Sequence, residues 1–268
     1  MKLLPRHFVF IGLFLLIAIT MALNIGVDVD ISPYTKNMYA YIDSLPEGST
    51  VMMSFDHEAS SLPEIRPIAL AVLRHAFRKN IKLIGVSLYP EGTLIGYRLM
   101  RNVAKEYDKT YGEDFVYLGF RPQYIAAILA MGESIENTYP QDYLGNDYQA
   151  LPMMQNIKNY DDIKAVISIA DGSLTTHWIE YGGQFNVKVL GAVTAAMVTT
   201  YDPYLSSNQM TAMIGGLRGA AEYEKMLGIK GGGARGMLAQ SSAHLYIIML
   251  VILGNIFYFR ERKKRQKN

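Results

Sequence analysis

The segment Ser54-Phe55-Asp56-His57-Glu58 holds the side-chain types that acid-base catalysis and metal binding use. A carboxylate beside an imidazole can move protons or ligate a cation, and a nearby hydroxyl can serve as a nucleophile. The apolar run Val51-Met52-Met53 precedes the segment, so these groups stand where a buried strand would leave a sheet. They form either a reactive cluster or the polar turn that such a strand needs.

Apolar segments of strand length alternate with segments of helical period through the middle of the chain. Strands that are apolar throughout are typical of a parallel sheet covered on both faces. We therefore expect a single doubly wound α/β domain over residues 26–236, with a mostly parallel sheet that resembles Rossmann-like and periplasmic-binding-like domains. Two subdomains joined near residues 139–160 are the alternative. The expected strands are Thr50–Phe55, Lys82–Tyr89, Phe115–Phe120, Ala165–Ala170 and a fifth within Val187–Val198; the expected helices include Leu62–Asn80, Gly92–Asp108, Gln123–Met131 and Leu205–Gly228.

Ligands of such sheets bind beyond the carboxyl ends of the strands, near the point where the strand order reverses. The polar residues that follow the expected strands are therefore the site candidates. The catalytic candidates are Asp56, His57, Asp171 and His177, and the ligand-binding candidates are Ser54, Glu58, Tyr89, Glu91, Arg121, Ser173, Tyr201 and Asp202.

Each chemistry open to these residues lacks part of its usual signature. Asp56, His57 and Asp171 could ligate Mg²⁺ or Ca²⁺, but no EF-hand or His-Glu-x-x-His spacing accompanies them. A serine hydrolase would need a Gly-x-Ser-x-Gly elbow, which the sequence does not contain. The turns after the strands offer single glycines rather than a phosphate loop, so Asp171 and Ser173 are interpreted as caps of the following helix. We expect no resident cofactor, with a divalent cation as the alternative.

Both ends of the chain predict membrane spans. Residues 8–25 form an uncharged run of 18 residues, which we interpret as an uncleaved anchor after a short cytoplasmic N-terminus (1–7), with a signal peptide as the alternative. A second apolar span is predicted over 237–259, after a flexible glycine-rich linker over 229–236. The final segment, 260–268, holds six basic residues, which predicts a cytoplasmic tail that attracts anionic lipid.

The charge distribution predicts the orientation of the chain. Basic residues flank the outer end of each span, so both termini are expected in the cytoplasm and the main domain on the extracytoplasmic side of the cytoplasmic membrane. The ends carry charges of +2 and +5, and the middle of the chain therefore carries −5 of the net +2. An acidic domain argues against a nucleic-acid partner. The chain has no cysteine, which excludes disulfides and thiolate chemistry.

Two further segments could form contacts with a ligand or a partner. Residues 139–160 hold four tyrosines and little regular period, so they form either a lid or binding loop or a surface excursion. The expected helix Leu205–Gly228 contains Gly215, Gly216 and Gly219. Glycine inside a helix is unfavourable, so another backbone should approach closely, either the chain's own sheet or a partner subunit.

The sequence therefore favours a membrane-anchored α/β binding or scaffold module without catalytic activity. Its expected partners are other membrane subunits of an envelope complex of the transport or export kind, and a small-molecule ligand is possible in the same frame. The alternative is a membrane-tethered hydrolase or metal-assisted transferase that acts on an envelope substrate. An enzyme requires His57 or His177 within hydrogen-bond reach of a carboxylate or hydroxyl in an open cleft.

Overall fold

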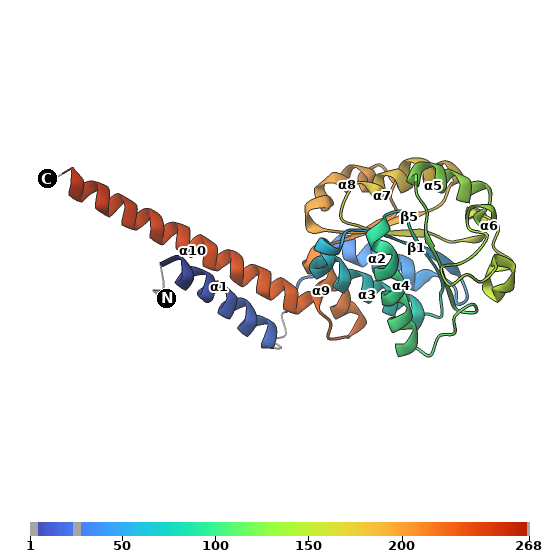
Figure 1. Cartoon of the computed structure of the whole chain (residues 1–268), viewed down its shortest axis with the longest axis horizontal. Helices are drawn as coiled ribbons and strands as arrows, with labels where there is room; N and C mark the ends of the chain where they lie inside the picture. The colour runs from blue at the N-terminus through green and yellow to red at the C-terminus, as the bar shows by residue number, and fades with distance from the viewer. Residues whose placement is uncertain (1–4, 24–27, 267–268) are drawn as a thin grey trace. The chain divides into compact units, whose positions relative to one another are not determined.

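The computed structural model describes residues 5–23 and 28–266, and the chain divides into two compact units. The first unit, residues 29–233, is an α/β domain around a six-stranded parallel sheet with the order β3-β2-β1-β4-β5-β6 (Figure 1). This is the order of doubly wound nucleotide-binding domains. The strands are β1 (Thr50–Asp56), β2 (Lys82–Ser87), β3 (Phe115–Phe120), β4 (Val166–Ala170), β5 (Val189–Val193) and β6 (Ala212–Gly215).

The predicted α/β class is confirmed, and the sheet is wholly rather than mostly parallel. The middle of the chain forms one unit, which excludes the alternative of two subdomains joined near residues 139–160. The helices of this unit are α2 (Pro33–Ser44), α3 (Leu62–Arg78), α4 (Pro90–Glu106), α5 (Tyr124–Glu133), α6 (Ile135–Thr138), α7 (Leu174–His177), α8 (Val198–Ser206) and α9 (Gly216–Leu227).

Alternating residues of the strands face two separate hydrophobic cores. Along β1, Val51, Met53 and Phe55 face the layer of α2, α3, α4 and α9, whereas Met52 faces the opposite layer. Figure 1 shows the two helical layers on opposite sides of the strands. Both faces of the sheet are therefore covered, which explains why its strands are apolar at nearly every position.

The expected helix Leu205–Gly228 is wrong, because this segment contains the sixth strand. The apolar residues of Ala212–Gly215 also fit a helical period, but the segment pairs with β5. Gly216, the first residue of α9, follows the strand with φ +65°, and a Cβ there would lie 2.8 Å from the Cβ of Ala195. A non-glycine residue is unfavourable in this conformation. Gly219 lies against Ile214 of β6, so the close neighbour is the chain's own sheet.

The segment 139–160 is not a lid. It packs as short turns against the sheet, and its side chains Tyr139, Tyr148, Met154 and Tyr160 are buried. The hydroxyl of Tyr148 donates to the carbonyl of Ile157 at 2.8 Å. The aromatic rings supply core volume where a longer helix would otherwise cover this face of the sheet.

The second unit contains α1 (Pro5–Ala22) and α10 (Gly233–Arg265). Within α10, residues 233–260 contain an 18-residue stretch with a mean hydropathy of 1.8, and none of that stretch is buried. Twenty-eight helical residues extend about 42 Å, which exceeds the roughly 30 Å hydrocarbon core. Among the described residues this is the one helix long and apolar enough to cross a membrane. The apolar part of α1 is shorter. The first predicted span, residues 8–25, ends in residues 24 and 25, which lie outside the described part.

The predicted flexible linker over 229–236 is wrong in its second half. Gly228 ends α9 in a left-handed conformation with φ +68°, and α10 begins at Gly233. The connection between the two helices is therefore only a few residues long.

Candidate functional site

The strand order reverses between β1 and β4, and most of the predicted polar residues meet at the carboxyl ends of these strands. The chain continues from β1 to β2 on one side, and from β4 to β5 on the other. The backbone N–H of Glu58, just after β1, donates to Oδ2 of Asp171, just after β4, at 2.8 Å. This bond joins the two strand ends at the position where doubly wound domains bind their ligands.

Asp56 lies at the end of β1 and is buried, with three hydrogen-bond donors around its carboxylate. The hydroxyl of Ser54 donates at 2.6 Å, the backbone N–H of Leu88 at 2.7 Å and Nε1–H of Trp178 at 3.2 Å. Burial raises the pKa of Asp56 to about 6, the negative charge of Asp171 adds to the rise, and the three donors oppose it. Asp56 therefore changes its charge near pH 6. Its hydrogen bonds also connect the end of β1 with Leu88, just after β2, and with Trp178, just after α7.

His57 is buried beside this carboxylate but bonds only to the backbone. Its Nδ1 lies 3.1 Å from the carbonyl oxygen of Glu58. A carbonyl can only accept, so Nδ1 carries the hydrogen and Nε2 carries a lone pair. Burial lowers the pKa of His57, against the raising effect of the Glu58 carbonyl, Asp171 and Glu91, and Nε2 has no hydrogen-bond partner. The ring is therefore a neutral imidazole with a buried, unpaired acceptor.

Two more carboxylates surround the start of α3. Glu91 accepts a hydrogen bond from the backbone N–H of Ala59 at 2.8 Å, and Glu58 accepts one from the hydroxyl of Tyr89 at 3.2 Å. A Cβ at Gly92 would collide with the carbonyl oxygen of Phe55, so glycine allows the start of α4 to lie against β1. Carboxylates thus occupy backbone N–H groups that would hold a phosphate in a nucleotide-binding domain.

The predicted cap of the helix after β4 is wrong. Asp171 caps the β1–α3 turn through Glu58 instead, and Ser173 makes no capping bond to α7. The capping prediction used neighbours in sequence, whereas the parallel pairing of β1 with β4 brings Asp171 closer to the turn of another strand.

The remaining candidates from β3 and β4 lie around this cluster rather than within it. The guanidinium of Arg121 lies 5.0 Å from the ring centroid of Tyr139, and its Nε is buried without a hydrogen-bond partner. His177 stacks on Tyr124 with ring centroids 4.6 Å apart, and its Nδ1 also has no partner. His177 is therefore packed between aromatic rings and not paired with an acid.

Tyr201 and Asp202 do not follow the fifth strand directly, as the sequence suggested. β5 ends at Val193, and both residues lie inside α8. The buried Tyr201 donates its hydroxyl to the carbonyl of Gly172 at 2.8 Å, and Asp202 lies beside Tyr34 of α2, whose pKa it raises. They support neighbouring elements rather than the cluster at β1.

Sequence reasoning missed two residues of this edge. Trp178 reaches Asp56 from the π-helical turn after α7, and Glu64 in the first turn of α3 accepts the backbone N–H of Ala195 at 2.6 Å. The acidic position of Glu64 in a first helical turn is a signal for a cap, but its partner lies 131 residues away in sequence.

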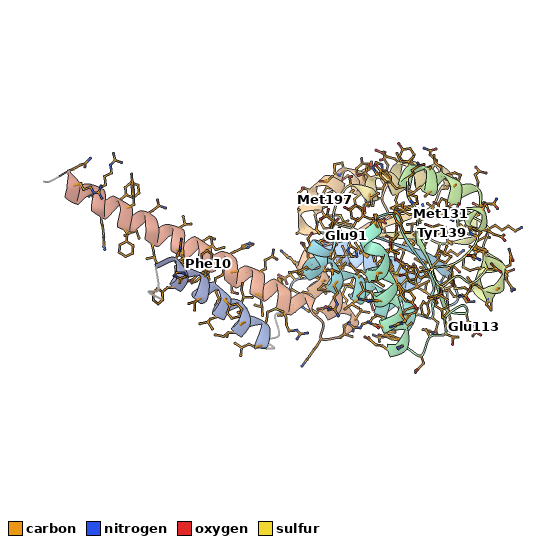
Figure 2. All side chains as sticks on the ribbon, in the orientation of Figure 1. Phe10, Glu91, Glu113, Met131, Tyr139 and Met197 are labelled. Atoms are coloured by element: carbon orange, nitrogen blue, oxygen red, sulfur yellow. The ribbon has the colours of Figure 1, made fainter. Side chains whose placement is uncertain are left out.

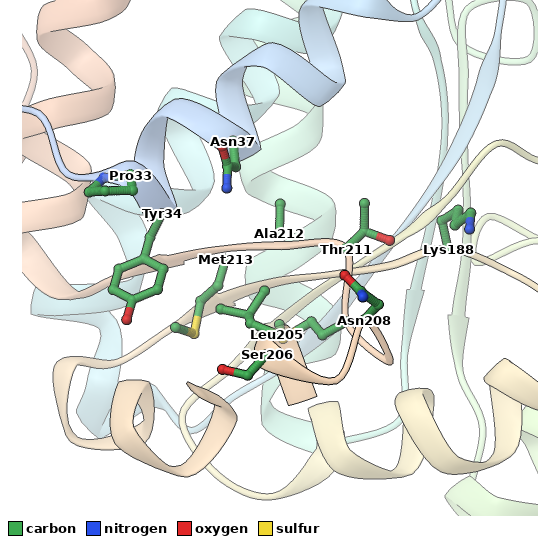
Figure 3. Close-up of a pocket in the computed structure, with 11 residues that line it drawn as sticks. Pro33, Tyr34, Asn37, Lys188, Leu205, Ser206, Asn208, Thr211, Ala212 and Met213 are labelled. Atoms are coloured by element: carbon green, nitrogen blue, oxygen red, sulfur yellow. The ribbon is translucent and has the colours of Figure 1, made fainter. Parts of the chain in front are cut away.

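A hollow of about 430 Å³ lies at the opposite edge of the sheet, between α2 and the amino ends of β5 and β6 (Figure 3). No predicted site residue lines it. Its polar side chains are hydroxyls, amides and the exposed Lys188, without a carboxylate or a histidine. The carboxyl edge of the sheet, which holds both, is therefore the candidate site. The lining residues are Pro33, Tyr34, Asn37, Lys188, Leu205, Ser206, Asn208, Met210, Thr211, Ala212 and Met213.

The described residues contain no group of three or more histidine or acidic side chains placed to hold a metal ion. Asp56, His57 and Asp171 are neighbours, but they do not form a closed set of ligands. Comparisons of the chain with protein-family models, curated proteins and solved structures give no match. The site must therefore be interpreted from its own geometry.

Proposed function

We propose that this chain is a membrane-anchored, extracytoplasmic α/β binding module that works without catalysis as a subunit of an envelope membrane complex. Its ligand site is the cluster at the carboxyl ends of β1 and β4. Both termini lie in the cytoplasm, and α1 and α10 anchor the domain.

The observation that carries this proposal is the environment of the two candidate bases. His57 bonds to a backbone carbonyl, and His177 stacks on Tyr124. An acid-base or nucleophilic mechanism needs such a base beside a carboxylate or hydroxyl. The carboxylates of Asp171 and Glu91 are instead bonded to backbone N–H groups, as in a rigid binding surface.

Purification of the full-length protein in a mild detergent, with mass spectrometry of co-purifying proteins, tests the complex. We expect a membrane partner in fixed ratio, retained when Asp56→Asn is purified in the same way. A protein that purifies alone and hydrolyses envelope substrates, with loss of activity in His57→Phe, would contradict the proposal and favour the enzyme alternative.

The absence of cysteine from the chain gives a direct test of the topology. Arg6→Cys, Glu113→Cys and Lys263→Cys each place one thiol at an end of the chain or on the domain. A membrane-impermeant maleimide added outside intact cells should label only Glu113→Cys. Labelling of either terminal variant would contradict the two-span arrangement.

A further inference from the structure

The chain covers one edge of its sheet with backbone hydrogen bonds and leaves the other edge open. At β3, the backbone N–H of Tyr143 donates to the carbonyl of Tyr117 at 2.9 Å. At β6, no described segment other than β5 supplies a hydrogen bond to residues 212–214. The two edges lie on opposite sides of the domain, as Glu113 before β3 and Met197 before α8 show in Figure 2. Backbone groups of β6 that face away from β5 therefore have no partner in the chain.

The open edge of β6 borders the hollow of about 430 Å³ that Figure 3 shows. Thr211, Ala212 and Met213 form its floor. The side chain of Ala212 belongs to the core beneath α2, and that of Met213 belongs to the core beneath α8. Residues of both helices line the hollow. A space that is bounded from both faces of the sheet lies beyond its edge strand rather than over either face.

The edge of β6 is recessed between two walls. Ala212 and Met213 are each 1% exposed, whereas Asn37 of α2 and Ser206 of α8 are exposed. Figure 3 shows Asn37 and Ser206 on opposite sides of the strand. A second copy of the domain would carry its own β6 behind the same walls, so two such edges could not meet. A single extended peptide has no walls of its own and can pair with an open strand edge.

The charges around the hollow favour an anionic group at one end. Among the described residues that line it, Lys188 alone is charged, and Lys188 forms no ion pair with the described part of the chain. An adjoining hollow of about 270 Å³ also has Lys188 as the one charged residue in its lining. Figure 3 shows Tyr34 and Lys188 at opposite ends, and Asp202 lies beside Tyr34. A carboxylate is therefore attracted to the Lys188 end and repelled from the other.

From these contacts we infer that β6 binds the C-terminal segment of a partner protein as a seventh, antiparallel strand, with the terminal carboxylate of that segment at Lys188. The direction follows from the position of Lys188, just before β5 and beside the amino end of β6, because a strand that ends there runs opposite to β6. β6 has four residues, so the two strands would pair over about 13 Å. The inference rests on the proposed function as a subunit of a complex and names one contact with a partner.

The test uses the full-length protein in an uncharged detergent and a phage library that displays random hexapeptides with free carboxyl ends. Enriched peptides are synthesised with an amino-terminal fluorophore, and their binding is measured by fluorescence anisotropy. Each peptide is compared with its C-terminal amide and with two forms that are N-methylated at alternate residues, one form at the odd and the other at the even positions. Thermal unfolding, followed by the fluorescence of Trp178, the single tryptophan, checks that each protein variant is folded.

Strand addition has a specific signature in these comparisons. Alternate N–H groups of an added strand face β6, so one N-methylated form should lose binding and the other should retain it. The amide should bind about threefold more weakly than the free acid, and Lys188→Gln should remove this difference. Lys164→Gln is the matched control, because Lys164 is also exposed and just before a strand but lines neither hollow. Ser206→Tyr, which adds a ring at one wall, should abolish binding.

Failure to enrich peptides on the wild type relative to Ser206→Tyr, or equal losses in the two N-methylated forms, would overturn the strand addition. Equal affinities of the acid and the amide would overturn the assignment of the carboxylate to Lys188. A dimer that dissociates in Ser206→Tyr, without peptide binding, would assign the edge to a second copy instead. If a membrane partner co-purifies with Ser206→Tyr as with the wild type and no peptide is enriched, the inference fails and the proposed function stands. If no partner co-purifies either, both fail.

Discussion

Asp56 should make the stability of the domain fall as the pH rises from about 4 to 7. Its pKa is about 6 in the folded protein, against an ordinary value of 3.8, because burial disfavours the carboxylate. The folded state therefore holds this proton more tightly than the unfolded state, and its share of stability is present at low pH and lost as the pH rises through the folded pKa.

The magnitude follows from the difference between the two pKa values. A shift of roughly two units corresponds to about 3 kcal/mol over the full titration, and about 2 kcal/mol of it falls between pH 4 and pH 7. The pKa values of His57 and His75 are lowered by burial, that of His75 to about 4, so these rings give up stability as the pH falls. The pH dependence of stability that these rings cause opposes the one that Asp56 causes. A measurement on the wild type by itself therefore does not separate the two.

The comparison of wild type with Asp56→Asn isolates the contribution. The asparagine side chain keeps an oxygen that can accept from the backbone N–H of Leu88. Its NH₂ group, however, takes the place of Oδ2, which accepts from Ser54 and Trp178 in the wild type. This mismatch should lower the free energy of unfolding by about 1 to 2 kcal/mol at every pH. Urea unfolding of both full-length proteins from pH 4 to pH 7 gives the difference in unfolding free energy. We expect the wild type to lose about 2 kcal/mol relative to the variant across this range. A difference that stays constant with pH would refute a raised pKa at Asp56.

Four further substitutions test the packing of the domain. Gly216→Ala should destabilise the domain by about 1 to 3 kcal/mol in urea unfolding, because φ is +65° and the new methyl group would press on Ala195. An unchanged midpoint of urea unfolding would contradict the requirement for glycine. Tyr160→Phe should lower the free energy of unfolding by about 1 kcal/mol, because it removes the 2.7 Å hydrogen bond to the Ile128 carbonyl. Tyr139→Phe removes a buried hydroxyl that has no partner and should be neutral or stabilising. Equal losses of stability in the two variants would disprove the assigned contacts. Glu222→Ala should lower the free energy of unfolding by about 2 kcal/mol or more, because this buried carboxylate accepts hydrogen bonds from Ser32, Thr35 and Arg218. The control is Glu113→Ala at an exposed position. A loss no larger than that of the control would argue against this role of Glu222.

Much of the fold follows from local patterns in the sequence. Strands buried on both faces read as continuous apolar runs, and the helices between them carry one apolar face, so five strands and the α/β class were predictable. The sixth strand was not, because the four residues of β6 fit a helical period as well as a strand. Only pairing with β5 and the close approach of Gly216 to Ala195 decide its structure.

The candidate site divides in the same way. The position of Asp56, His57 and Glu58 at the carboxyl edge follows from the end of an apolar run, and the sequence by itself determined that. Which partners these groups meet depends on the order of the strands, since β1 pairs with β4 across more than a hundred residues of chain. That pairing brings Asp171 to the turn after β1 and Trp178 to Asp56, and it leaves Nε2 of His57 without a partner. Residue types set the available charges and donors, but tertiary structure alone decided their distances, because hydrogen bonds act between groups that the fold, and not the sequence, makes neighbours.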